Sequence, residues 1–134
     1  MSSYDNAGKL VLRLAIGILL LLHGLAKLAN GISGISGMVA AHGWPAFVAY
    51  GVYVGEVLAP ILLILGIFTR PAALVAAVNM IVAILLAHKA QIFSLSTTGG
   101  WSLELQGLFL FGSIAIALLG AGRYSLGGAG GRYN

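Results

Sequence analysis

The sequence predicts an all-α integral membrane protein, a four-transmembrane-helix bundle whose N and C termini are both cytoplasmic. Hydrophobic residues make up 60% of the 134 positions and charged residues only 7%, which is far from the balance of a soluble protein. The apolar residues stand in long runs, whereas a soluble chain alternates apolar and polar positions. A helix needs roughly 17 to 25 mostly apolar residues to cross about 30 Å of hydrocarbon. Four runs qualify.

We expect these helices in a single membrane domain, residues 1–126, at about residues 10–28, 47–68, 71–87 and 103–119. Pro71 suits a first helical turn, and Gly120 suits a helix exit. Only Thr69 and Arg70 separate the second and third helices, so these two should be antiparallel neighbours. Residues 127–134 are rich in glycine with nothing to bury, and we expect a flexible tail.

Basic residues predict the orientation. An even number of helices places both termini on one side, with Lys9, Arg13, Arg70, Arg123 and Arg132, and leaves Lys27 and Lys89 opposite. The positive-inside rule then assigns the termini to the cytoplasm. The net charge of +4 is spread between apolar runs and forms no basic stripe, so we expect no nucleic-acid partner.

The chain lacks the residues and motifs that several kinds of catalytic and cofactor site require. The chain has no cysteine, which excludes disulfides, thiolate nucleophiles and Cys-ligated clusters. It also lacks the glycine-rich nucleotide motifs, the Gly-x-Ser-x-Gly nucleophile motif and His-Glu-x-x-His. A redox role would therefore use a lipid-soluble carrier such as quinone, held between helices and protonated by Glu or His.

Ionisable side chains inside a bilayer cost several kcal/mol unless they are paired or wetted, so each one asks for an explanation. The predicted topology gathers five of them in the outer half of the bundle as a candidate polar or substrate-binding cluster: His23, Lys27, Glu56, His88 and Glu104. Glu56 is the deepest, roughly 13 Å along the second helix.

Four further residues are secondary candidates: Arg13, Tyr53, Asn79 and Lys89. Arg13 shares one stripe of the first helix with Lys27 and two glycines, and small residues on such a stripe let helices approach closely. Tyr53 lies on the Glu56 face of the second helix. Asn79 stands in the middle of the third helix, where an interhelical hydrogen bond is the default role.

Pro60 lies four residues after Glu56 and removes the backbone donor that the Glu56 carbonyl would otherwise use. We therefore expect a kink at this carboxylate.

Two accounts of the cluster remain open. In the structural account, Glu56 and Glu104 neutralise Lys27 and Lys89 and fasten the helices together. In the functional account, the same groups exchange a proton or bind a polar head group. Axial haem ligation by His23 and His88 is a weaker alternative, and no His-x-x-x-His or Glu-x-x-His spacing indicates a metal site.

With these residues in view, the chain resembles the DoxX family of four-helix bacterial membrane proteins from Leu12 to Leu126. The matching elements appear in family order: Arg13-Leu14-x-x-Gly17, His23-Gly24-x-x-Lys27, Gly55-Glu56, Leu65-Gly66-x-x-Thr69-Arg70-x-Ala72-Ala73, His88, Glu104-Leu105 and Gly120-x-Gly122-Arg123-Tyr124-Ser125-Leu126. Gly127 departs from the pattern, since the family often has Asp there.

The resemblance implies a multi-pass protein of the bacterial inner membrane, related to the membrane subunit of thiosulfate:quinone oxidoreductases. Our first hypothesis is thus a membrane subunit of a quinone-linked redox system with soluble or membrane partner subunits. The alternative is a non-enzymatic scaffold or a small-solute or lipid permease, in which the cluster is structural or a polar path. Lipid-facing Gly and Ala positions would also suit a homo-oligomer.

Overall fold

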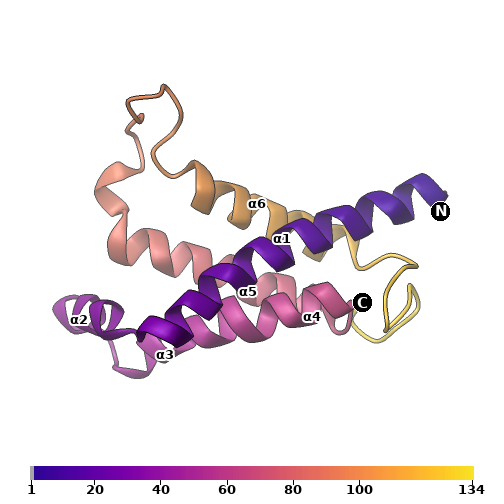
Figure 1. Ribbon diagram of the computed structural model, residues 1–134, viewed down its shortest axis with the longest axis horizontal. Coiled ribbons are helices and arrows are strands. Elements are labelled where there is room, and N and C mark those ends of the chain that lie inside the picture. Colours follow the sequence, from indigo (N-terminus) through magenta and orange to yellow (C-terminus); the bar gives the residue numbers. More distant parts are fainter. Residues whose placement is uncertain (1) are drawn as a thin grey trace.

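The structure is a computed structural model that describes residues 2–134, and its regular secondary structure is helical (Figure 1). Among these residues the β-structure is limited to an isolated bridge between Leu95 and Trp101. The elements follow in this order: α1 (Ser3–Asn30), α2 (Ser33–Ala41), α3 (Phe47–Tyr53), η1 (Val54–Leu58), α4 (Ala59–Leu65), α5 (Thr69–Ala87), η2 (Lys89–Gln91) and α6 (Glu104–Leu119).

Three helical segments are long and apolar enough to cross a membrane, judged by length and composition: Ser3–Asn30, Phe47–Leu65 and Thr69–Ala87. The fourth apolar helix, α6, has 16 residues and falls short of that length. These helices make the chain a multi-pass membrane protein. Four spans, and the side on which the termini lie, remain predictions.

The helices pack in antiparallel pairs, with α5 against α6 and α1 against the segment formed by η1 and α4. The two termini lie at the same end of the molecule (Figure 1). Alanines on α5, including Ala73 and Ala76, are fully buried and let neighbouring helices approach. They join Leu20, Leu63 and Ile116 in one apolar core.

The second apolar segment is interrupted in the middle. Residues Val54–Leu58 form a π-helical turn, in which the amide of Ala59 donates to the carbonyl of Val54, five residues earlier. Pro60 follows directly and cannot donate to the Glu56 carbonyl, as expected from the sequence. The distortion anticipated at Glu56 therefore takes the form of a wider helical turn.

A tight turn joins α4 and α5. Gly66 adopts a left-handed conformation with φ of 74° and ends α4, and Phe68 precedes α5 with φ of 46°. The antiparallel pairing predicted for these helices is present.

The connection between α1 and α3, rich in Gly and Ser, contains a short helix, α2, that the sequence patterns did not predict. Val39 on α2 is buried, and it packs with Ile32, Ala49 and Val52 in a second apolar cluster at the end of the bundle away from the termini. This cluster holds α2 beside α3.

The C-terminal segment folds back onto the turn between α4 and α5. Asn134 is buried, and its side-chain oxygen accepts a hydrogen bond of 3.0 Å from the amide of Thr69 at the start of α5. Its side-chain nitrogen donates to the carbonyls of Gly66 and Gly128. The expectation that residues 127–134 have nothing to bury therefore does not hold for Asn134, because this asparagine satisfies backbone groups left open at a helix start. The flexibility of the segment stays a prediction.

Candidate functional site

A cavity of about 690 Å³ runs between α3 and η1 on one side and α5 on the other. Its walls are apolar side chains, among them Val52, Val75 and Val82, and Met38 of α2 contributes at the end away from the termini. Several wall residues, such as Val78, are also exposed on the outer surface of the bundle. We call this cavity the α3–α5 groove.

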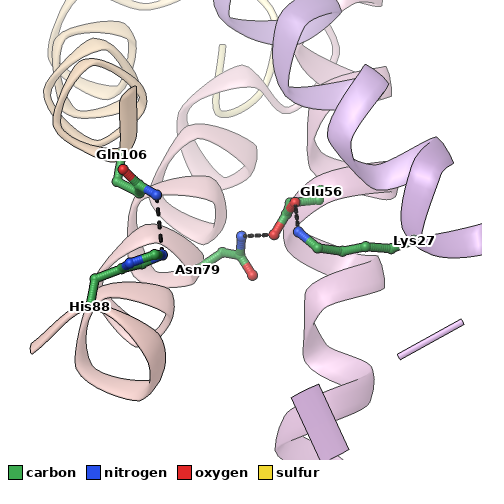
Figure 2. A network of polar contacts seen from close by, with 5 residues as sticks. All are labelled: Lys27, Glu56, Asn79, His88 and Gln106. Atoms are coloured by element: carbon green, nitrogen blue, oxygen red, sulfur yellow. Dashed lines mark hydrogen bonds and ion pairs between the residues drawn. The ribbon is translucent and has the colours of Figure 1, made fainter. Parts of the chain in front are cut away.

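Lys27, Glu56 and Asn79 form one polar group in the groove (Figure 2), and His88 is a further polar residue of its lining. Glu56 is only 2% exposed, and both of its carboxylate oxygens are engaged. The ammonium of Lys27 on α1 pairs with Oε1, and Nδ2 of Asn79 on α5 donates a 2.8 Å hydrogen bond to Oε2. Three separate helical segments thus meet at one carboxylate.

Two glycines explain how the segments come so close. A methyl group at Gly24 of α1 would overlap the carbonyl of Glu56, and one at Gly55 would overlap the side chain of Asn79. Gly24 therefore lets α1 touch η1 one turn before Lys27, which places the ammonium beside the carboxylate. This contact explains the spacing of Gly24 and Lys27 in the motif His23-Gly24-x-x-Lys27.

The Glu56 carbonyl that Pro60 leaves without its usual donor is the same carbonyl that faces Gly24. A glycine Cα–H is a weak hydrogen-bond donor that recurs at close helix contacts. The π-helical turn, the proline and the glycine contact all coincide at Glu56, and π-turns often mark functional positions.

His88 lines the groove at the end away from the termini, apart from the Glu56 group (Figure 2). Its Nδ1 lies 2.9 Å from Oε1 of Gln91, and its Nε2 lies 3.3 Å from Nε2 of Gln106 on α6. A proton on Nδ1 satisfies both contacts, with Gln106 donating to the bare Nε2. His88 lies at the end of the groove away from the termini.

The other two members of the predicted cluster lie elsewhere. His23 is exposed and packs edge-on against Phe109 of α6, with ring centroids 5.6 Å apart. Glu104 is exposed at the start of α6 and lines a shallower surface hollow with Trp101. Depth along the helices was predicted from sequence, but rotation about the helix axes separates these side chains from Glu56.

The secondary candidates divide in the same way. Asn79 joins the Glu56 group, whereas Tyr53 packs against the apolar cluster around Val39 and Lys89 is exposed in η2. Arg13 is 1% exposed near the end of the bundle that holds the termini, far along α1 from Lys27.

The Arg13 guanidinium donates to four main-chain carbonyls. The acceptors are Leu63 at 2.7 Å, Ile64 at 3.3 Å, Ala121 at 2.7 Å and Tyr124 at 3.1 Å. These carbonyls belong to the last turn of α4 and the chain just beyond α6, where backbone acceptors lack helical partners. Arg13 thus ties three segments together and does not face the groove.

No group of three His, Asp or Glu side chains that could hold a metal ion occurs within residues 2–134. The residue that sequence reasoning missed is Gln106, a polar side chain in the first turn of α6, and its amide next to a long apolar run was the available signal. Gly55 was noted only as part of a motif, although its lack of a side chain admits Asn79.

Comparison with known proteins identifies the family of this chain. A family model described as DoxX matches residues 8–89. An uncharacterized protein of Haemophilus influenzae is 35% identical over 104 residues, which cover 75% of this chain and 76% of that protein. A Bacillus subtilis protein named "Putative oxidoreductase CatD" is 31% identical over 121 residues, covering 90% of this chain and 85% of that one. No solved structure matches.

Proposed function

The chain belongs to the DoxX family of membrane proteins, and from that premise we propose that it is a membrane subunit of a quinone-linked redox system. In this proposal the protein spans the bacterial inner membrane four times, and the α3–α5 groove holds a quinone. A partner subunit, soluble or membrane-bound, exchanges the electrons.

The observation that carries the proposal is the ion pair between Lys27 and the buried carboxylate of Glu56 at an apolar groove. The volume of about 690 Å³ falls in the range of sites for small molecules, roughly 300 to 1,000 Å³. Apolar walls suit an isoprenoid tail, and a few convergent polar groups suit a ring with oxygen substituents. Since wall residues of the groove are exposed on the bundle surface, a ligand could enter sideways from the lipid.

The relative from Bacillus subtilis supports a redox assignment through its printed name. A bound quinone would supply a carrier of two electrons and two protons that moves within the lipid phase. The residues of this chain would hold the quinone in place. Lys27 can donate a hydrogen bond to a ring oxygen, Asn79 holds the carboxylate from the other side, and Glu56 keeps the local charge balanced.

The test is the quinone content of the detergent-purified protein, measured by native mass spectrometry and lipid extraction. Glu56→Gln is compared with Glu104→Gln, which changes an exposed carboxylate outside the groove in the same way. We expect quinone in the wild type and in Glu104→Gln, and its loss from a folded Glu56→Gln. A wild type that remains empty after incubation with excess quinone would overturn the proposal.

One observation favours a second candidate, a non-enzymatic scaffold or permease. Both oxygens of Glu56 are already satisfied by protein groups, as expected of a fastener between helices. Breaking such a pair costs up to about 3 to 5 kcal/mol when fully buried, and less here because the Lys27 side chain is 30% exposed. A Glu56→Gln variant that unfolds earlier while ligand content never changes would support this second candidate.

A further inference from the structure

The Glu56 group leaves two hydrogen-bonding functions unused. Lys27 carries three N–H donors and uses one of them on Glu56. Asn79 uses Nδ2 on Glu56, and within residues 2–134 its Oδ1 has no hydrogen-bond partner. Figure 2 shows this oxygen pointing away from the carboxylate. Lys27 and Asn79 both line the α3–α5 groove, which therefore offers a ligand one kind of donor and one acceptor.

We propose that the groove binds a neutral head group carrying a hydroxyl, and so prefers a reduced quinol over the corresponding quinone. The inference rests on the proposed function, because it concerns the redox form held at the same site. Asn79 is the specificity-determining residue in this proposal, and Glu56 positions Lys27 and Asn79.

The quinone and the quinol differ in the hydrogen bonds that they can make with the groove. A quinone oxygen only accepts, so it can bond Lys27 but leaves Oδ1 of Asn79 without a donor. A phenolic hydroxyl both accepts and donates and can satisfy both residues. Covering an acceptor without a partner costs more than a hydrogen bond contributes, which penalises the quinone.

Charge balance explains why the head should be neutral. Lys27 and Glu56 cancel each other, and the groove walls are apolar. A phosphate or carboxylate head group would bring a negative charge close to Glu56, while the lining residue His88 lies apart from Glu56 with both ring nitrogens already in contact with glutamine side chains. Such a charge is costly to desolvate unless it is paired. A neutral phenol avoids this cost.

The test compares three ligands with the same ring and short tail: the quinone, its quinol, and the dimethyl ether of that quinol. Binding to the wild-type protein in detergent is measured by calorimetry without oxygen. The ether keeps the ring shape and the acceptors but cannot donate. We expect the quinol to bind about 5-fold to 10-fold more tightly than either of the others, the effect of one hydrogen bond.

Asn79→Leu should remove this preference, because neither redox form then meets an unpaired Oδ1. Asn6→Leu is the matched control, because it removes a buried, hydrogen-bonded amide that lies outside the groove, and it should keep the preference. If Asn79→Leu fails to fold, the comparison of the three ligands on the wild type still tests whether the groove prefers the quinol.

The outcomes distinguish this inference from the proposed function. Equal affinity for quinone and quinol, or an ether that binds as well as the quinol, overturns the inference and leaves a quinone site in place. A preference that survives in folded Asn79→Leu overturns the role of Asn79. Failure of all three ligands to bind overturns the proposed function itself.

Discussion

Replacing Arg13 with methionine should destabilise the bundle severely, although Arg13 lies outside the groove. The side chain is 1% exposed and donates to four carbonyls, two of them at 2.7 Å. A hydrogen bond from a charged group contributes about 1.5 to 3 kcal/mol net. If the two short bonds dominate, the free energy of unfolding should fall by about 3 to 6 kcal/mol, because methionine keeps the volume but leaves the carbonyls unpaired.

Two companion variants separate charge from geometry. Arg13→Lys keeps the charge, but a single ammonium cannot spread over carbonyls of α4 and of the chain after α6, so less than half of the loss should return. Arg70→Met is the control, since Arg70 also donates to two carbonyls, those of Ala117 and Leu118, but is exposed. The free energy of unfolding of Arg70→Met should fall by less than about 1 kcal/mol.

The assay is unfolding in mixed micelles by titration with a denaturing detergent, followed by circular dichroism of the helices. An Arg13→Met variant within about 1 kcal/mol of the wild type would refute the reasoning. It would mean that these carbonyls find water or other donors at no cost. A loss of equal size in Arg70→Met would refute the dependence on burial.

Two further predictions concern helix approach and topology. Gly24→Ala should cost about 1 to 3 kcal/mol in the same unfolding assay, because its Cβ would overlap the Glu56 carbonyl, whereas Gly51→Ala meets nothing within 4 Å and should be neutral or slightly stabilising. Equal effects at the two glycines would contradict the close contact. The chain has no cysteine, so Ser2→Cys and Phe93→Cys can each be labelled alone in intact cells and in inverted vesicles. Four spans require the two positions to react from opposite sides, and reaction from the same side would rule out that topology.

Hydropathy predicted the apolar helices because lipid exposure selects long apolar runs whatever the neighbours are. The first helix extends beyond the predicted span of about 10–28, since α1 begins at Ser3 with a polar turn closed by a capping box between Ser2 and Asp5. Hydropathy also missed α2, because Gly and Ser between residues 33 and 37 are typical of a loop, whereas the packing of Ile35 and Val39 in the second apolar cluster supports a helix there.

The candidate site was predictable in part. The cost of placing an ionisable group in a bilayer singled out Lys27 and Glu56, and Asn79 was a secondary candidate. The structure places all three in contact. The same arguments grouped Glu104 with them, although it is exposed on another face. Depth in a membrane follows from counting residues, whereas the direction of a side chain depends on how each helix is rotated against its neighbours. That rotation is fixed by contacts such as Gly24 against Glu56, which no single segment encodes.

The π-helical turn of Val54–Leu58 also sets the phase between the two halves of its helix. A π-turn accommodates one residue more than an α-turn, so α3 and α4 present faces that are offset by about 100° from a continuous helix. Removing any one residue from the turn would restore a regular helix by rotating one half against the other. The wall of the groove and the face that packs on α1 would then no longer both meet their partners. Length in this stretch is therefore as constrained as residue identity, and a one-residue deletion here should be more damaging than most substitutions.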